Sequence, residues 1–83
     1  MKKEYNGWKN HQTWNVAFWI NNDEYLYRAA TEFMENNNNK KSAPYGRFIK
    51  KMGMEYDKTP DGIAYAGTRL DYRALNDMMR ELV

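Results

Sequence analysis

The side chains that could carry out catalysis are few in this chain of 83 residues. It contains one histidine, His11, one serine, Ser42, and no cysteine. A nucleophile activated by an imidazole would therefore require these two residues to meet in the fold. Because His11 lies among polar residues just before an apolar stretch, we interpret it as a hydrogen-bonded or solvent-facing residue near a helix start. The sequence predicts a protein that is not an enzyme.

Motifs for metal ions, cofactors and phosphate groups are absent from the sequence. It has no His-x-x-x-His pair, no calcium-loop spacing and no cysteine ligands, so a metal would depend on scattered oxygen atoms. The carboxylates of Asp57 and Asp61 could flank a site, but a turn already explains Asp61. Gly62 and Gly67 lack the Lys-Ser/Thr pair that completes a phosphate-binding loop. We expect no bound cofactor and no metal site.

Basic residues are concentrated between residues 40 and 51, where no acidic residue occurs. They are Lys40, Lys41, Arg47, Lys50 and Lys51. Such a cluster could neutralise phosphates, and Tyr45 or Trp8 could stack on exposed bases. The same residues also fit the solvent-facing side of an amphipathic helix, and the net charge of +2 is small for a nucleic-acid-binding protein. Nucleic-acid binding is one alternative for the function.

Aromatic residues make up 16% of the chain, including three tryptophans and seven tyrosines. Trp and Tyr supply much of the binding energy in protein interfaces, so part of this ring surface could bind a partner. The candidates for partner binding are Trp8, Trp19, Tyr25 and Tyr27. Trp19 is the first choice, because it sits across its helix from Trp14 and Phe18. A small core could also use rings simply to fill volume, and this reading stays open for each ring.

Four helices are predicted to position these side chains, at residues 14–21, 24–36, 43–52 and 72–82. Thr13, Asp23 and Asp71 are the expected N-caps, and Gly53 is expected to end the third helix. At 100° per residue, apolar side chains surround the whole axis of the first helix, so we expect it to be central and covered on several sides. The expected core draws on all four helices: Trp14, Phe18, Leu26, Phe33, Phe48, Ile49, Leu75 and Met79.

A short β-hairpin is predicted between the third and fourth helices. The segment Thr59-Pro60-Asp61-Gly62 has the composition of a tight turn, in which Pro fixes φ and Gly accepts positive φ. The apolar residues on both sides of this turn predict two strands, at residues 54–58 and 63–67. The predicted fold class is mainly α with this hairpin, in a single domain over residues 1–83 whose residues 1–5 are expected to be flexible.

Asn15 is an amide within the most apolar stretch of the chain. A buried amide without a partner would cost about 1–3 kcal/mol. We expect its side chain to bond the backbone of residues 7–12 or of the hairpin, and so to fix elements that packing alone would leave loose. Replacement of Asn15 by leucine should then lower the melting temperature.

The sequence has no feature of a secreted or membrane protein. Its first residues lack the apolar run of a signal peptide, and no stretch approaches the roughly 18 consecutive apolar residues that suit a membrane span. The absence of cysteine fits a reducing compartment. We expect a soluble cytoplasmic protein.

Residues 13–24 form a distinctive box with the pattern Thr-Trp-Asn-Val-Ala-x-Trp-Ile-x-Asn-Asp-Glu, and Tyr5-Asn6-Gly7-Trp8 precedes it. Together with the turn at residues 59–62 and the terminal segment at residues 71–82, this box resembles a family of small proteins of unknown function carried by phages, plasmids and related mobile elements. The resemblance covers about two-thirds of the chain. It implies a genomic setting, with location in the host cytoplasm for a phage-encoded member, and it implies no catalytic residues.

Small accessory proteins of such elements often act by binding host proteins. The leading expectation is therefore a non-enzymatic phage or mobile-element protein that binds a host macromolecule, in the first place a protein, as a host-takeover factor or an inhibitor of a defence system. One alternative is a small nucleic-acid-binding protein that uses the basic helix face. The other is a homodimeric structural module whose surplus apolar surface covers itself. None of these readings involves a membrane.

Overall fold

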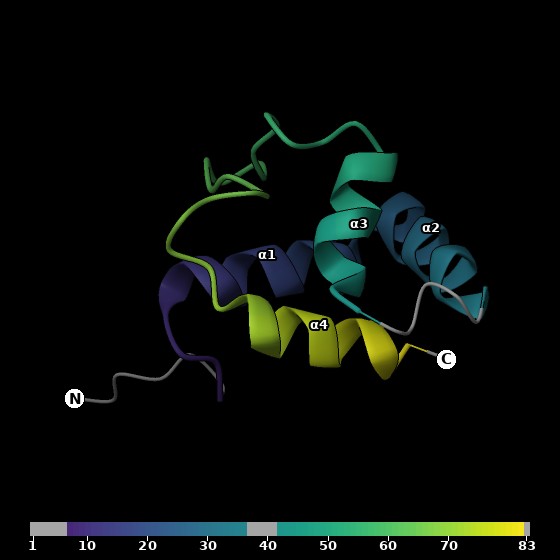
Figure 1. The fold of residues 1–83 in the computed structure, drawn as a ribbon. Helices are drawn as coiled ribbons and strands as arrows, with labels where there is room; N and C mark the ends of the chain where they lie inside the picture. The colour runs from purple at the N-terminus through teal and green to yellow at the C-terminus, as the bar shows by residue number, and fades with distance from the viewer. Residues whose placement is uncertain (1–6, 37–41, 83) are drawn as a thin grey trace.

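The computed structural model describes residues 7–36 and 42–82, and within these ranges the chain forms four helices (Figure 1). They are α1 (His11–Asn22), α2 (Glu24–Glu35), α3 (Pro44–Lys51) and α4 (Tyr72–Arg80). α1 packs mainly against α2, and α3 packs mainly against α4. The long connection between α3 and α4 returns over the N-terminal half of α1, as Figure 1 shows.

Some sequence-based expectations concern residues outside these ranges. The flexibility expected for residues 1–5 and the two predicted nucleic-acid contacts Lys40 and Lys41 lie outside the described residues. Among the residues that are described, no helix is both long enough and apolar enough to pass through a bilayer.

α1 begins at His11 rather than at residue 14, because Asn10 is its N-cap instead of Thr13. The Asn10 Oδ1 atom accepts a hydrogen bond from the Thr13 backbone N–H at 2.9 Å and another from the Thr13 hydroxyl at 2.7 Å. The same two side chains reach the segment before α4. The Asn10 amide donates to the Arg69 carbonyl at 2.8 Å, and the Thr13 hydroxyl accepts from the Asp71 N–H at 2.9 Å. The starts of α1 and α4 are therefore bonded to each other.

One residue, Asp23, joins α1 to α2. Its backbone N–H donates to the Trp19 carbonyl at 2.9 Å and closes the last turn of α1. Its carboxylate accepts from the Leu26 N–H at 3.0 Å and caps α2. The predicted cap at Asp23 is therefore present, and the carboxylate also lies where the helix dipole favours negative charge. Such a short connection fixes the corner between the two helices.

The core lies where the inner faces of the four helices meet. Six of the eight predicted core residues are buried: Leu26, Phe33, Phe48, Ile49, Leu75 and Met79. Val16 and Ile20 of α1 are completely buried among them, together with Met34 of α2 and Tyr45 of α3. Burial of these side chains from water is the main favourable contribution to folding.

The prediction that Trp14 and Phe18 belong to the core is wrong. Trp14 is half-buried, and Phe18 retains 40% of its accessible surface. At 100° per residue, both project from the side of α1 opposite to Val16 and Ile20, which face the other helices. The all-round apolar pattern predicted a helix covered on every side, but Phe18 on this side keeps part of its surface in water.

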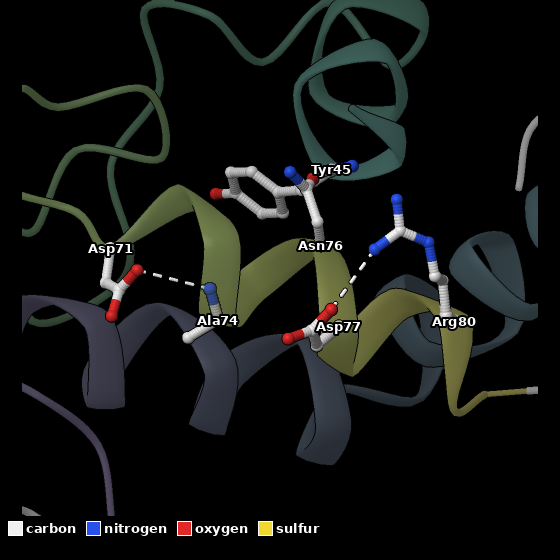
Figure 2. A network of polar contacts seen from close by, with 6 residues as sticks. All are labelled: Tyr45, Asp71, Ala74, Asn76, Asp77 and Arg80. Atoms are coloured by element: carbon white, nitrogen blue, oxygen red, sulfur yellow. Dashed lines mark hydrogen bonds and ion pairs between the residues drawn. The ribbon is translucent and has the colours of Figure 1, made fainter. Parts of the chain in front are cut away.

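The start of α3 is capped by a side chain from another helix. Ala43, in the N-cap position, has a left-handed backbone with φ 42° and gives no side-chain cap. The Asn76 side chain of α4 supplies the acceptor, and the Tyr45 N–H donates to its Oδ1 atom at 2.9 Å. Figure 2 shows the two residues at the contact between α3 and α4. α3 and α4 are therefore joined by a polar contact as well as by packing.

The predicted hairpin is wrong. The described part of the chain contains no β-strand, and residues 54–58 and 63–67 share only an isolated antiparallel bridge between Lys58 and Ala64. The turn itself forms, with Gly62 at φ 88°, but the Thr59 hydroxyl accepts the backbone N–H groups of Asp61 and Ile63, both at 3.2 Å. Local bonds of this kind compete with a strand ladder, so the segment folds as a loop that lies on α1.

Candidate functional site

The loop that replaces the hairpin is attached to α1 through Asn15. The Asn15 side chain is buried; its Oδ1 atom accepts from the Thr59 hydroxyl at 2.7 Å and its Nδ2 atom donates to the Asp61 carboxylate at 2.8 Å. Asn15 thus fixes this loop as expected, although its partners are side chains of the turn rather than backbone groups. The pairing satisfies an amide that would otherwise be costly to bury.

Asp61 receives a second hydrogen bond, from the indole of Trp19. The Trp19 Nε1 atom donates to the same carboxylate oxygen at 2.9 Å. The bonds from Asn15 and then Trp19 hold the pKa of Asp61 below its ordinary value, because both favour the charged carboxylate. Trp19, the first choice for an outward anchor, is half-buried and bonded to the turn. Its partner-binding role stays a prediction.

Four rings form a continuous array along the outer side of α1. His11 and Trp14 have centroids 5.7 Å apart, Trp14 and Phe18 are stacked at 5.4 Å, and Phe18 meets Trp19 edge-on at 5.5 Å. Sequence reasoning missed this surface, since it assigned two of these rings to the core. The signal that could have found it is the spacing of residues 11, 14 and 18, which places them on one helix face.

A surface groove lies beside the packing of α4 on the C-terminal end of α1. It is lined by Gly7, Trp8, Asn21, Tyr27, Ala74, Asp77, Met78, Glu81 and Leu82. We call it the Trp8–Tyr27 groove, because it brings together two of the predicted partner-binding residues. Met78 is also held by Asn21, whose amide donates to its sulfur at 3.3 Å.

The rim of the Trp8–Tyr27 groove carries two acidic residues, Asp77 and Glu81. Asp77 forms an ion pair with Arg80 on the exposed side of α4, at 3.1 Å (Figure 2). None of the described residues that line the groove is a lysine or arginine. The groove therefore combines aromatic and aliphatic surface with negative charge, which suits a ligand that carries both an apolar side chain and a basic one.

Tyr25 lies elsewhere. It retains 70% of its accessible surface and lines a different groove between α2 and α3, with Phe48, Met52 and Lys51. The structure thus pairs Trp8 with Tyr27 and leaves Tyr25 and Trp19 at separate places. No single surface holds all four partner-binding candidates among the residues described.

The basic candidates of α3 are only partly available for phosphate contacts. Lys50 and Lys51 are exposed, while Arg47 is half-buried and donates to the Ser42 carbonyl at 2.8 Å. Lys51 shares its groove with both Glu32 and Arg28. Lys50 and Lys51 are thus the basic side chains that α3 exposes, and their role in nucleic-acid binding stays a prediction.

The side chains that could take part in catalysis lie in different elements or have structural roles. His11 belongs to the ring array, and Ser42 is exposed before α3. Burial raises the pKa of the Tyr45 hydroxyl, which donates to the Tyr65 carbonyl. Over residues 7–36 and 42–82, no three His, Asp or Glu side chains form a group that could hold a metal ion.

Comparison with known proteins places the chain in a family. The profile of a family of unknown function (DUF7249) matches residues 1–83. No curated protein and no solved structure matches the chain. The chain therefore belongs to this family of unknown function.

Proposed function

We propose that this member of the DUF7249 family is a non-enzymatic binding protein that docks on a partner protein through the Trp8–Tyr27 groove. One observation carries the proposal: Trp8 and Tyr27, from separate parts of the chain, line one open groove with Met78 and Leu82. Aromatic and methionine side chains are enriched at the centres of protein interfaces, and methionine adapts its shape to the partner.

The lining also defines the chemistry of the partner. Trp8, Met78 and Leu82 supply apolar surface in the groove, and the carboxylates of Asp77 and Glu81 lie beside them. A suitable partner segment has an apolar side chain next to a lysine or arginine. The apolar side chain would be buried in the groove, and the basic side chain would form an ion pair with Asp77 or Glu81. Because these ion pairs would face water, they would contribute more to the association rate and to orientation than to affinity. We therefore expect binding to persist in moderate salt.

The biological setting is part of the same proposal. The resemblance of the box at residues 13–24 to small phage- and plasmid-borne proteins supports a role as an accessory protein of a mobile element. In that role the partner is a host protein, and the chain acts in the host cytoplasm as a takeover factor or an inhibitor of a defence system. Recognition by a surface groove fits this role, because an inhibitor of this type needs no chemistry of its own.

A second candidate function is nucleic-acid binding through α3. The observation that favours it is the groove between α2 and α3, which both Lys51 and the exposed ring of Tyr25 line. A base could stack on the tyrosine while the lysine contacts a phosphate. Such binding would weaken steeply as salt rises, whereas docking in the Trp8–Tyr27 groove would change little.

The proposal is tested by affinity capture from a lysate of the organism that carries the gene. The wild-type chain should retain a specific protein that Tyr27→Ala and Glu81→Lys both lose. Both residues are exposed, so neither change should unfold the chain. Asp57→Lys is the matched control, because Asp57 is an exposed acid in the loop between α3 and α4, outside this groove, and it should retain the same protein. Equal capture by all four chains would contradict the proposal.

A further inference from the structure

Two adjoining hollows lie between the start of α1 and the segment that precedes α4. The first is also lined by Ile63 and Ala64 of the loop, and the second by Lys9. No described residue lines both these hollows and the Trp8–Tyr27 groove. We call the two hollows together the Lys9–Arg69 pocket, because they share four lining residues: Gln12, Thr68, Arg69 and Leu70.

The size of the pocket suits a small molecule. The hollow beside Ile63 and Ala64 has a volume of about 240 Å³, and the hollow beside Lys9 has a volume of about 450 Å³. Sites for small molecules measure about 300–1,000 Å³. Since the two hollows share lining residues, one molecule could occupy both.

The two hollows differ in chemistry. Ile63 and Ala64 are half-buried and Leu70 is buried, so the first hollow offers an apolar wall. The second hollow has the side chains of Lys9 and Arg69, both exposed. A guanidinium can bind a carboxylate or a phosphate through two parallel hydrogen bonds. The pocket therefore places an apolar surface next to a site for an anion.

The two basic side chains are available for a ligand. Among the residues that the structure describes, none forms a hydrogen bond or an ion pair with the side chain of Lys9 or Arg69. The Thr68 hydroxyl and the Gln12 amide line the same hollow and can donate further hydrogen bonds to an anion. Four side chains could thus contribute donors.

Two carboxylates near the pocket already have partners. Asp71 lines the second hollow, but its carboxylate accepts from the Ala74 N–H at 3.2 Å and caps α4 (Figure 2). The Asp61 carboxylate binds two side chains of α1, and Asp61 is not among the lining residues. Lys9 and Arg69 therefore face one acidic residue in the lining, and the pocket keeps a positive charge.

The backbone around the pocket is fixed by hydrogen bonds. The Arg69 carbonyl accepts from the Asn10 amide at 2.8 Å, and the Gly67 carbonyl accepts from the Tyr72 hydroxyl at 2.7 Å. A ligand would consequently order the side chains of the pocket but not its backbone, which limits the entropic cost of binding.

We propose that the Lys9–Arg69 pocket binds a small organic anion. The carboxylate or phosphate group of this ligand contacts Lys9 and Arg69, and its apolar group lies against Ile63 and Ala64. Phenyl phosphate and benzoate are suitable probes, because each joins one ring to one anionic group and the two probes distinguish a phosphate from a carboxylate.

Titration of the isotope-labelled chain, followed by the NMR shifts of its backbone amides, tests the proposal. At least one of the two probes should shift amides of residues 62–70 in a saturable way. Inorganic phosphate, acetate and benzyl alcohol should each bind about tenfold more weakly, because each uses only one hollow. Failure of both phenyl phosphate and benzoate to bind would overturn the proposal, and so would equal binding of phenyl phosphate and inorganic phosphate if phosphate is the preferred anion.

Substitutions test the role of the two basic residues. Lys9→Ala and Arg69→Ala should each weaken binding about tenfold and leave the circular-dichroism spectrum unchanged, since both side chains are exposed. Arg73→Ala is the matched control, because Arg73 is an exposed arginine of α4 that does not line the pocket. Unchanged binding by Arg69→Ala, or an equal loss in Arg73→Ala, would contradict the proposal.

The result is independent of the proposed function. Tyr27→Ala alters the Trp8–Tyr27 groove and should leave the titration unchanged, whereas Arg69→Ala should still capture the partner protein.

Discussion

The side-chain amide of Asn15 donates to the carboxylate of Asp61 at 2.8 Å, and so joins two residues that are 46 positions apart in the sequence. Through this bond and the hydroxyl of Thr59, the long loop between α3 and α4 lies on α1. The same carboxylate also accepts a hydrogen bond from the Trp19 indole at 2.9 Å. Asp61 therefore joins the loop to two side chains of α1.

Replacing Asn15 with leucine should lower stability. The change removes the amide that pairs with both Thr59 and Asp61, and it leaves a buried hydroxyl short of one partner. We expect a loss of about 1–3 kcal/mol in the free energy of unfolding, measured by urea denaturation. Asn22→Leu is the control, because Asn22 is exposed. An unchanged or raised stability of Asn15→Leu would show that the loop does not depend on this bond.

Acid should destabilise the chain through Asp61. Bonds from Asn15 and Trp19 lower its pKa in the folded chain, below the value of about 3.9 that an unfolded Asp has. A group with a lowered folded pKa stabilises the fold above its unfolded pKa, and this contribution is lost as pH falls through the folded pKa. The melting temperature of the wild type should therefore fall more between about pH 5 and pH 2 than that of Asp61→Asn.

Asp57→Asn serves as the control for this acid effect, because Asp57 is an exposed carboxylate in the same loop. Its melting temperature should follow the pH dependence of the wild type. Identical pH profiles for the wild type and Asp61→Asn would contradict the role given to Asp61.

Removing the side chain of Asn76, which lies on α4 and caps the start of α3, should destabilise the first turn of α3. In Asn76→Ala the Tyr45 N–H loses its hydrogen-bond acceptor. We expect the free energy of unfolding to fall by about 1 kcal/mol. Hydrogen exchange at the Tyr45 amide should become faster, and Asn76→Asp, which keeps an acceptor oxygen, should preserve most of the protection. Unchanged exchange in Asn76→Ala would mean that the cap contributes nothing.

Ala43→Gly should stabilise the chain. Ala43 has φ 42°, a left-handed conformation that costs a residue with a side chain roughly 1–2 kcal/mol. Glycine removes this strain but adds freedom to the unfolded chain, so a net gain of about 0.5 kcal/mol is expected. Ala66→Gly is the control, because Ala66 is exposed and does not have a positive φ. This change should lower the stability. A loss of stability in Ala43→Gly, measured by urea denaturation, would refute the prediction.

Local signals in the sequence were informative about the helices. The caps Asp23 and Asp71 are the residues that the capping rule indicates, and both carboxylates accept a backbone N–H in the first turn of their helices. These bonds involve residues three apart, so the sequence contains all the information needed to predict them.

The failed predictions depend on contacts between distant residues. A helix that is apolar all round gives no sign of which side its neighbours will cover, so Trp14 and Phe18 were assigned to the core. The hairpin failed because the Thr59 hydroxyl binds backbone N–H groups and the Asn15 amide, and Asn15 is remote in the sequence. The groove that Trp8 and Tyr27 both line also depends on residues far apart in the sequence, because its other lining residues include Met78 and Leu82.

Site-specific photo-crosslinking tests the central claim most directly, namely that the Trp8–Tyr27 groove is where a partner protein docks. A photoreactive phenylalanine derivative at position 27 should form a covalent adduct with one host protein in living cells. The same derivative at position 56, whose native tyrosine is 96% exposed, should form none. Addition of Glu81→Lys to the chain with the probe at position 27 should abolish the adduct. Adducts of equal yield from positions 27 and 56, or none from position 27, would contradict the claim.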